Sequence, residues 1–541
     1  MRYPQATRAS ILVAVATVGL GGTTLAGAQT EPGSSPLNIA GNRQLFIDRT
    51  FIENARGIEL RVHQPVKTGE LTIKPDHPWE QGGIGPYSSV LWEPGKPGEP
   101  GAYHMWYHAM TTTQWHTGDD RGAICYARSR DGIHWEKPAL DLVPFEGSSG
   151  NNIVLGHGAA GAKLGQDGGM VFIDPTAPPD QKFRMAIRVK EFGEGLHVYS
   201  SPDGIRWRCT HPSVITARPE QGNHHLDSQN VLFWDAGLGK YVAYVRRNVK
   251  DAGSQGRSIA RGESATLDGF PVVQDMPVVF GPDRDDLFHH DVPAVDYYMS
   301  AAIRYPWADR AYFMFPTAYY HYLGGILPEF KGEVPTNAGP LHTQFAASRD
   351  GIRWERFGRE PFVPLGMKGE FDWASARVFY GMVPDVSGRY LYMYYRASDW
   401  LHGWDRDERN KRLLTAAGLG ASENIAVISR VVLRRDGFVS VRAAYTGGEF
   451  ATPPLVFTGR QLVLNIDTSA TGIARVEIQD ANGAPLPGYG LDDCDLIHTT
   501  NEINRVVSWQ GRRDVTGLAG RPIRLRFSLR DADLYAMQFT D

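Results

Sequence analysis

Cysteine is scarce in this chain of 541 residues, where only Cys125, Cys209 and Cys494 occur, far apart in the sequence. An odd number at such spacing fits neither a disulfide framework nor a zinc site. Cys125 and Cys209 lie in strand-like runs, where a buried free thiol is the ordinary state. The sequence therefore predicts no disulfide scaffold, and we expect no metal ion and no cofactor.

Long runs of charge are also missing, and 56 Lys and Arg stand against 60 Asp and Glu. Nucleic-acid binding needs a clustered basic surface, so this balance argues against a nucleic-acid partner. The length predicts two domains, one of them large. Aromatic residues make up 11% of the chain, alongside 60 Gly and 35 Pro. This mixture is typical of many short strands joined by tight turns.

Beyond the N-terminus, no apolar run is long enough to span a bilayer. The first residues combine a positively charged start, an apolar stretch at 11–25 and small residues at 26–28. This pattern predicts a secretory signal over 1–28, with Gln29 as the mature N-terminus. A membrane anchor fits less well, because the stretch is short and contains glycine. We expect an exported protein, periplasmic or extracellular, without membrane attachment after cleavage; its oligomeric state stays open.

The most informative feature is a repeat of the form Ser-x-Asp-Gly-Ile-x-Trp, found at Ser129–Trp135, Ser201–Trp207 and Ser348–Trp354. Weaker copies surround Asp268-Gly269 and Asp436-Gly437, and neighbouring copies lie 65 to 86 residues apart. Asp-Gly between two β-rich runs is a hairpin signal, because Gly accepts positive φ and Asp bonds its own backbone. Each Asp-Gly is therefore expected to join the last two strands of a sheet.

Two further strand-like runs precede each of these hairpins, which gives four strands per unit and five units. In the first unit they are Val90–Trp92 and Tyr103–Tyr107, ahead of Ala123–Ala127. Radial repetition of four-stranded sheets is a β-propeller. The sequence therefore predicts an all-β fold, with a five-bladed β-propeller over 36–440 followed by a C-terminal β-sandwich over 441–541. A stack of sandwiches is the alternative, but units of this size are small for it.

The segment Tyr126–Glu136 resembles the SxDxxHW segment of the first blade in glycoside hydrolase families 32, 43 and 68, which are five-bladed propellers. Family 32 also carries a C-terminal sandwich, so the architecture here resembles family 32 over nearly the whole mature chain. The resemblance implies a glycosidase acting on an oligo- or polysaccharide in a funnel-shaped site on the propeller axis. Two carboxylates would cut the bond, one protonated to assist the leaving group and one ionised.

In these families the acids come from the first strands of the first three blades. Counting back along those strands reaches Asp167 in the second blade and Asp227 in the third. In the first blade the count reaches Gly85-Pro86, and the family's Asn-Asp-Pro-Asn-Gly motif is absent. Glu80 and Asp76 lie in the preceding loop and could reach in to supply the missing acid. Asp227 is predicted as general acid and Asp167 as base, or as the orienting carboxylate if Glu80 supplies the base.

Two of these acids also have a plainer interpretation. Asp167 lies in a Gly-rich turn, where Asp is common for turn geometry alone. Glu80 follows a tryptophan and suits a structural role or a sugar contact. Polar and aromatic side chains at strand starts and in loops complete the predicted site. The predicted substrate-binding residues are His225, Gln229, His290, Arg304, Arg377, Tyr87 and Trp307.

Two other classes of function stay open. A propeller that binds glycans without cleaving them is favoured by the missing first-blade motif. A phosphorylase or lyase on the same scaffold is the third possibility. A phosphorylase needs a basic pocket, for which Arg304 and Arg377 are the hints, but export away from cellular phosphate argues against it.

Overall fold

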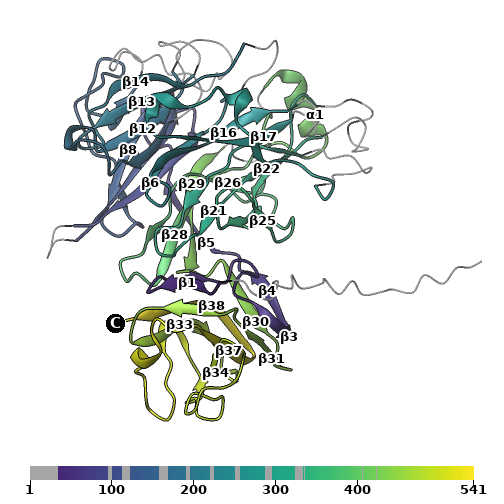
Figure 1. Ribbon diagram of the computed structural model, residues 1–541. Coiled ribbons are helices and arrows are strands. Elements are labelled where there is room, and N and C mark those ends of the chain that lie inside the picture. The colour runs from purple at the N-terminus through teal and green to yellow at the C-terminus, as the bar shows by residue number, and fades with distance from the viewer. Residues whose placement is uncertain are drawn as a thin grey trace, which may run out of the picture.

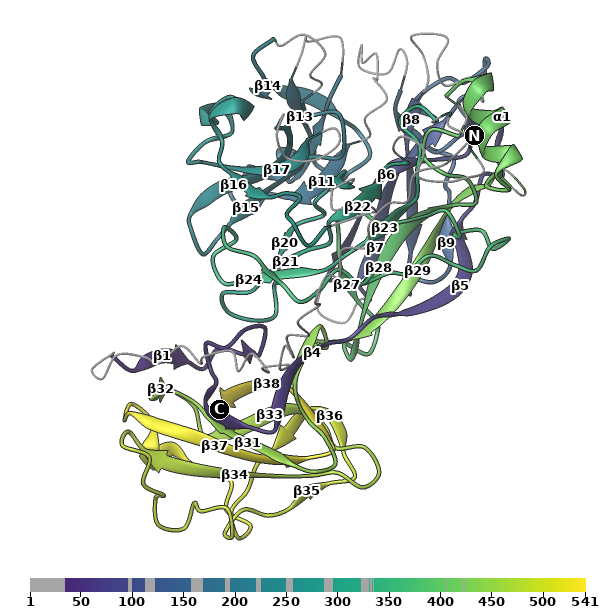
Figure 2. The same cartoon turned by 90° about the vertical axis from the view of Figure 1, so that its right-hand side faces the viewer.

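The computed structural model describes most of the chain beyond the predicted signal. The described residues are 35–95, 100–111, 122–156, 169–189, 195–219, 225–249, 256–286, 295–322, 330, 333, 335–404, 406–421, 423 and 425–541. They are nearly all β, which confirms the predicted fold class, and their only α-helix is α1 (Glu408–Ala416). Nowhere in this part of the chain does a helix have the length and apolar character needed to cross a membrane. Figures 1 and 2 show a large body of β-sheets beside a smaller C-terminal body.

The first three repeat units each form an antiparallel sheet whose strands follow in chain order. The predicted runs at the first unit lie within its first three strands. The first unit contains β6 (Ile84–Glu93), β7 (Ala102–Met110), β8 (Gly122–Ser129), β9 (Trp135–Glu136) and β10 (Ile153–Leu155). The second contains β11 (Met170–Ile173), β12 (Phe183–Ile187), β13 (Leu196–Ser201) and β14 (Arg208–Ile215). The third contains β15 (Val231–Asp235), β16 (Lys240–Asn248), β17 (Arg257–Ser264) and β18 (Val278–Phe280).

Interrupted strands divide the fourth unit between two sheets, and the first half joins the fifth unit through a parallel pair, β23 with β26. The first half contains β19 (Val295–Tyr297), β22 (Thr317–Tyr320) and β23 (Leu341–Thr343). The second half contains β20 (Ile303–Arg304), β21 (Tyr312–Met314), β24 (Ala346–Ser348) and β25 (Glu355–Arg356). The fifth unit contains β26 (Ser375–Val378), β27 (Val383–Pro384), β28 (Tyr390–Ser398), β29 (Ala426–Arg434) and β5 (Val66–Ile73). Because β5 precedes the first unit, its pairing with β29 ties the start of the propeller to its end.

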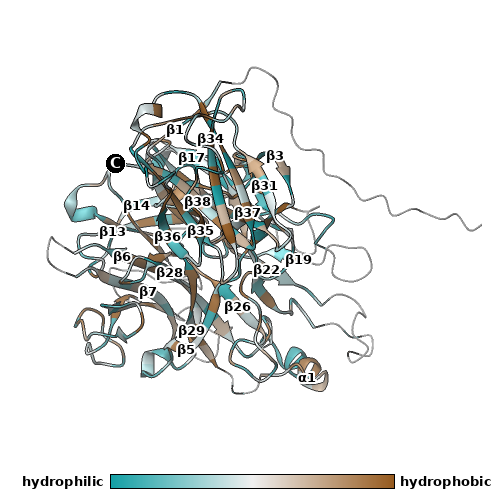
Figure 3. Ribbon diagram, turned by 90° about the horizontal axis from the view of Figure 1, so that it is seen from below, coloured by the Kyte–Doolittle hydropathy of each residue, from teal (hydrophilic) through white to brown (hydrophobic). Residues whose placement is uncertain are grey.

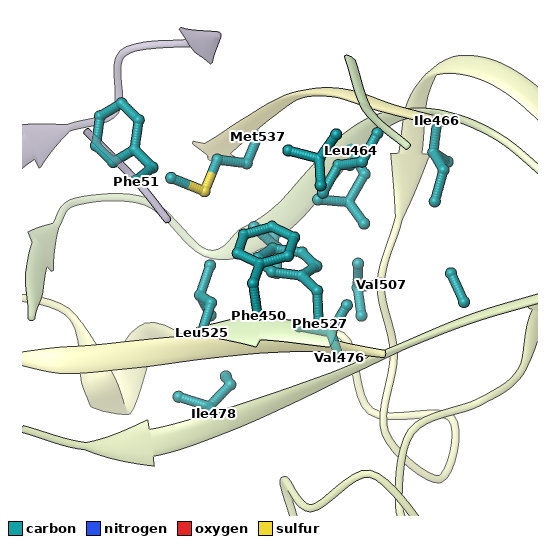
Figure 4. Packing of buried hydrophobic residues seen from close by; sticks show 14 of the residues in the cluster. Phe51, Phe450, Leu464, Ile466, Val476, Ile478, Val507, Leu525, Phe527 and Met537 are labelled. Carbon is teal, nitrogen blue, oxygen red and sulfur yellow. The ribbon is translucent and has the colours of Figure 1, made fainter. Parts of the chain in front are cut away.

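Two sheets form the C-terminal sandwich. One contains β1 (Leu37–Ala40), β3 (Glu53–Arg56), β31 (Gly448–Ala451), β32 (Leu455–Phe457), β34 (Ile473–Asp480), β35 (Ile497–His498) and β37 (Ile523–Arg530). The other contains β2 (Gln44–Leu45), β4 (Ile58–Val62), β30 (Val439–Ala443), β33 (Gln461–Asp467), β36 (Asn501–Val506) and β38 (Ala532–Thr540). Apolar residues alternate with polar ones along β37, as the banding in Figure 3 shows, so one face is buried. Phe450 and Phe527 stack there with ring centroids 4.9 Å apart (Figure 4).

The N-terminal strands differ from the sequence-based division. Residues 37–62 were assigned to the propeller, but β1 to β4 pair with sandwich strands. Short strands carry no sequence signal for partners that lie some 400 residues away in the chain. The chain therefore enters the sandwich first, builds the propeller, and returns to the sandwich at β30.

The fifth Asp-Gly copy is also placed differently from the expectation that it closes a hairpin within one sheet. It joins β29 of the propeller to β30 of the sandwich. Asp436 is buried, with a left-handed φ of +62°. Its carboxylate accepts hydrogen bonds from Arg43 Nε and Tyr305 Oη, both at 2.6 Å. This copy fixes the junction of the two bodies.

The three strong copies of the repeat close identical turns. In the first, Ser129 Oγ accepts from Gly132 N at 2.9 Å, while Asp131 Oδ1 accepts from the next two backbone N–H groups at 2.8 Å. The second and third copies repeat these contacts at Ser201–Trp207 and Ser348–Trp354. The motif is thus a self-contained hairpin cap, as the sequence predicts.

Each turn is also held by the second strand of the preceding unit. Trp106 Nε1 on β7 donates to Gly204 O at 2.6 Å, and Tyr244 Oη on β16 donates to Gly351 O at 2.8 Å. Tyr394 Oη on β28 donates in the same way to Gly132 O. The motif tryptophan packs edge-on against the same ring in all three copies, with centroids 5.6 to 6.3 Å apart. We call this arrangement the inter-unit clamp.

The cysteines fit the sequence-based interpretation in part. None of the three cysteines forms a disulfide, and Cys125 and Cys494 are buried. Cys209 is half-buried on the last strand of the second unit.

The inter-unit clamp predicts a defined loss of stability for Tyr244→Phe. The substitution keeps the ring but leaves the buried Gly351 carbonyl without its donor, which costs about 1–3 kcal/mol of unfolding free energy. Urea denaturation of the purified protein measures the change. Tyr445→Phe, at a tyrosine that is 67% exposed, is the control and shifts the value by less than about 0.5 kcal/mol. Equal stability of Tyr244→Phe and wild type would contradict the clamp.

Candidate functional site

We call the end of the propeller where each unit's first strand begins the upper end. Just inside it, the first strands are linked across the axis. Gln229 Nε2 donates to Ser88 O at 2.6 Å, and Tyr380 N donates to Gln229 Oε1 at 3.2 Å. Its amide therefore ties the third unit to the first and the fifth. The sequence predicts that Gln229 binds substrate. In the structure it is buried, and both ends of its side-chain amide are occupied by the hydrogen bonds to the first and fifth units.

Glu80 lies in η1 (Pro78–Glu80), just ahead of the first strand of the first unit, and is fully buried. Oε1 accepts from Tyr107 Oη at 2.6 Å, and Lys137 Nζ bridges both oxygens at 2.9 and 2.8 Å. Oε2 also accepts from the backbone N–H groups of Asp76 and His77. Every face of this carboxylate is occupied, so the structure argues for a structural role rather than the predicted base.

A histidine ring occupies the upper end of the first unit. A Cβ built on Gly85 would lie 2.3 Å from His108 Nδ1, and one on Gly122 would lie 2.1 Å from Nε2. The ring therefore needs glycine on both neighbouring strands. This explains physically why the first unit has Gly85-Pro86 where the resembling families carry an acid. Burial lowers the pKa of His108 to about 4, so the ring is neutral near pH 7.

Asp227 precedes the first strand of the third unit, and its side chain is 36% exposed. Its carboxylate lies 3.4 Å from Arg246 Nη1 and 3.9 Å from Arg188 Nη1. The left-handed turn at Leu226 is fixed by Asn230, whose amide donates to Leu226 O and Ser228 O. Asp227 is thus an accessible acid on a rigid support.

Tyr298 lies at the centre of the upper end. The guanidinium carbons of Arg246, Arg257 and Arg377 lie 5.8, 5.4 and 6.0 Å from its ring centroid. Tyr87 Oη from the first unit lies 3.4 Å from Tyr298 Oη. Side chains from the first, third, fourth and fifth units therefore converge here. The Tyr298 cluster, as we define it, consists of Tyr87, Arg246, Arg257, Asp296, Tyr298, Tyr319, His321, Arg377 and His402.

Asp296 is the buried acid of this cluster. It accepts from Arg257 Nη1 and lies beside His321 Nε2, both at 2.8 Å. Burial raises the pKa of Asp296, but the hydrogen bond to His321 and the charge of Arg257 outweigh it and leave the pKa below its ordinary value. Burial and then the positive charges of Arg377 and Arg257 lower the pKa of His402 well below its ordinary value. Asp296 is thus ionised and His402 neutral near pH 7.

The other predicted residues fall in different places. Tyr87 and Arg377 belong to the Tyr298 cluster. His225 is buried beside it, and its Nδ1 accepts from Asn248 N at 3.2 Å. Asp167 and His290 lie outside the described residues.

Arg304 and Trp307 lie at the opposite end of the propeller. Arg304 Nε pairs with Asp235 Oδ1 at 3.3 Å, beside the turn that ends the first strand of the third unit. Trp307 packs on Tyr305 near the sandwich, with ring centroids 5.2 Å apart. The structure therefore does not bring these two residues together with Asp227.

Sequence reasoning missed the centre of the cluster. Asp296, Tyr298 and Arg257 were not singled out, although Val295–Tyr298 interrupts an apolar strand start with an acid and two tyrosines. Among the described residues, no group of three or more His, Cys, Asp or Glu side chains is arranged to hold a metal ion.

Comparison with known proteins gives fold-level likeness alone. No protein-family model and no curated protein matches this chain. Among solved structures, a glycoside hydrolase is 12% identical with a TM-score of 0.42, covering 69% of this chain and 92% of that chain. An N-acetylgalactosamine deacetylase from F. plautii, in complex with blood group B trisaccharide, is 11% identical with a TM-score of 0.41, covering 71% and 97%. A family 43 arabinoxylan arabinofuranohydrolase from Bacillus subtilis, in complex with cellotetraose, is 13% identical with a TM-score of 0.36, covering 87% and 99%. Likeness at this level assigns no activity to this chain.

The buried His108 predicts a pH-dependent loss of stability. Its folded pKa of about 4 lies below the ordinary 6.5, so on acidification the unfolded chain takes up a proton before the folded chain does. The neutral His108 ring contributes to the free energy of unfolding in full above about pH 6.5, and this contribution is lost as the pH falls toward 4. From about pH 7.5 to about pH 5 the loss amounts to about 2 kcal/mol.

Urea denaturation at both pH values, for wild type and His108→Gln, isolates this contribution. Other buried histidines titrate in both proteins and cancel in the difference. The variant should lose less unfolding free energy than wild type between the two pH values. Identical pH dependence in both proteins would show that His108 is not held neutral.

Proposed function

We propose that this protein is an exported glycoside hydrolase that cleaves an oligo- or polysaccharide at the upper end of its propeller. The observation that carries the proposal is Asp227, a partly exposed carboxylate on a rigid turn, beside tyrosines and arginines that converge from four units. Carboxyl groups beside the scissile bond are what glycosidic cleavage requires. The export signal and the sequence resemblance support the same assignment.

The chemistry needs a second carboxylate in reach of the same bond. Asp296 is ion-paired with Arg257 and hydrogen-bonded to His321, so it suits a supporting role. Asp167 remains our proposal for the partner of Asp227. With Glu80 held in its own network, two acids carry the reaction, and Asp227 is either the general acid, as the sequence predicts, or the ionised partner.

Tyr298 and Tyr87 are largely buried, at 7% and 3% exposed, and the part of each side chain that faces the upper end is suited to contact a sugar, because aromatic side chains combine an apolar face with a hydroxyl group. Tyr87 lies on β6, and Tyr298 directly follows β19, where its backbone N–H donates to Thr317 O at 2.8 Å. Arg246 connects this aromatic pair to the acid, since its guanidinium lies near both the Tyr298 ring and Asp227.

A second candidate function is glycan binding without cleavage. One observation favours it: the upper end of the first unit carries the His108 ring between two glycines, with no acid at the position that the resembling families use. The two functions predict different results for wild type, because a binding protein releases no sugar.

Hydrolysis of a panel of plant and microbial glycans by wild type and Asp227→Asn tests the proposal. The variant should lose activity by about 10²- to 10⁴-fold, the usual contribution of an acid–base group. Asp180→Asn, at an exposed aspartate paired with Arg208, is the matched control and should retain full activity. Full activity of Asp227→Asn would refute its role, and binding without any release by wild type would favour the second candidate.

Aryl glycosides separate the two roles of Asp227. If it is the general acid, Asp227→Asn retains most activity on substrates whose leaving group needs no proton. If it is the ionised partner, activity is lost on both substrate types, and added azide restores it by replacing the missing carboxylate. Equal losses on both substrate types without rescue would exclude both roles.

A further inference from the structure

The cations of the Tyr298 cluster outnumber its acids. Arg246 contacts Asp227, and Arg257 is paired with Asp296. Arg377 has no carboxylate within ion-pair distance among the described residues, although it is only 4% exposed. Its Nε also has no hydrogen-bond partner within the described part of the chain. One buried guanidinium in the cluster therefore lacks a counter-ion there.

A second arginine lies beside Arg377 on the same sheet. Arg377 on β26 lies directly opposite Arg396 on β28 in the register of the fifth unit. Directly opposed residues share a face of the sheet, and like charges in that position destabilise it. Arg396 donates to Ser398 Oγ at 2.7 Å and to Ile84 O at 3.3 Å. Two arginine side chains of the fifth unit therefore lie on the same face of the sheet, and Arg377 is the one without a described carboxylate partner.

The surroundings of Arg377 do not compensate its charge. Tyr87, Tyr298 and Tyr319 are its nearest electrostatic partners, and burial lowers the pKa of its guanidinium. His402 is neutral beside it. A buried cation among neutral aromatic groups is expensive in free energy unless an anion pairs with it. A fixed, planar guanidinium fork is suited to bind a carboxylate or an oxyanion through two hydrogen bonds.

We propose that the Tyr298 cluster binds an anionic group of the glycan, the carboxylate of a uronic acid or a sulfate ester, with Arg377 as its main partner. The proposal rests on the proposed function only in taking the ligand to be a glycan. Tyr298 and Tyr87 flank the sugar ring that carries the anion. Arg246 touches both the Tyr298 ring and Asp227, so the anionic sugar lies next to the acid.

Binding to matched probes tests the charge preference. We would titrate Asp227→Asn protein, so that nothing is cleaved, with oligogalacturonides and oligoglucuronides and with their neutral methyl esters. Sulfated galactan oligosaccharides and their desulfated forms make up the second arm. The anionic member of at least one pair should bind about 10- to 100-fold more tightly, the range expected for charge-assisted hydrogen bonds. The arm in which the preference occurs identifies the carboxylate or the sulfate.

Variants assign that preference to Arg377. Arg377→Met should abolish it while leaving the affinity for the neutral member unchanged, and Arg377→Lys should retain part of it because the charge remains without the fork. Arg208→Met, at an arginine that is 59% exposed, is the control and should retain the full preference. No preference for any anionic probe, or a preference that survives in Arg377→Met, would overturn the proposal.

Thermal stability separates a ligand site from a structural ion pair. Removing an uncompensated buried charge should leave the melting temperature of Arg377→Met equal to or above that of wild type. A marked fall would mean that a carboxylate of the chain pairs with Arg377, which contradicts the inference. The melting temperature of wild type should rise with the preferred anionic probe, and that of Arg377→Met should not.

The two proposals fail in different ways. If wild type binds anionic glycans through Arg377 but releases no sugar, the proposed hydrolase activity is refuted and the proposed anion site is supported. If wild type releases sugar from neutral glycans alone and Arg377→Met is fully active, the proposed anion site is refuted and the proposed hydrolase activity is supported.

Discussion

The hydrogen bond from a second-strand aromatic to the glycine carbonyl of the neighbouring Asp-Gly turn is the contact on which the propeller depends. It occurs at the three strong copies of the motif and couples the hairpins of the first, second and fourth units to the unit before each. A four-stranded sheet has two faces to bury, so a unit is stable only when its neighbours are placed correctly. The clamp fixes that placement at the outer turns, and Gln229 fixes it at the axis.

Because the contacts that hold the units together lie at the hairpin turns and at Gln229, the side chains at the upper end are available for function. Outer hairpins and inner-strand links carry the structural role, while residues at the starts of the first and third strands converge on Tyr298. Strand-borne side chains are held more rigidly than loop-borne ones, which suits recognition of a defined group. The cost of the arrangement is a guanidinium buried without a described counter-ion, and such an imbalance is more often found at functional sites than in structural cores.

The fold was largely predictable because its signals are local. Ser-x-Asp-Gly-Ile-x-Trp encodes a turn, and alternating β-rich runs encode strands on either side of it. The N-terminal strands were not assigned correctly, since the partners of 37–62 lie in the C-terminal region and pairing over that distance has no local signature. The same lack of a local signal explains why the turn at Asp436 was expected to lie within one sheet. Its Asp-Gly sequence matches the other copies, although it joins the propeller to the sandwich.

The site was predictable only in part. Counting back along the first strands found Asp227, because position along a strand can be read from the sequence, and residue type at strand starts and in loops suggested Tyr87 and Arg377. It could not show that Gln229 and Glu80 are enclosed by hydrogen-bond partners from distant segments. It also could not show that Arg304 and Trp307 face the other end of the propeller. Which charges remain unpaired depends on packing between units, and that became visible only in three dimensions.

A crystal structure of Asp227→Asn bound to an acidic oligosaccharide tests the central claim most directly. The account predicts a sugar ring beside Tyr298 and Tyr87, with its carboxylate or sulfate oxygens within hydrogen-bond distance of the Arg377 guanidinium. A carboxylate of the chain itself on Arg377, or a glycan bound away from the Tyr298 cluster, would contradict it.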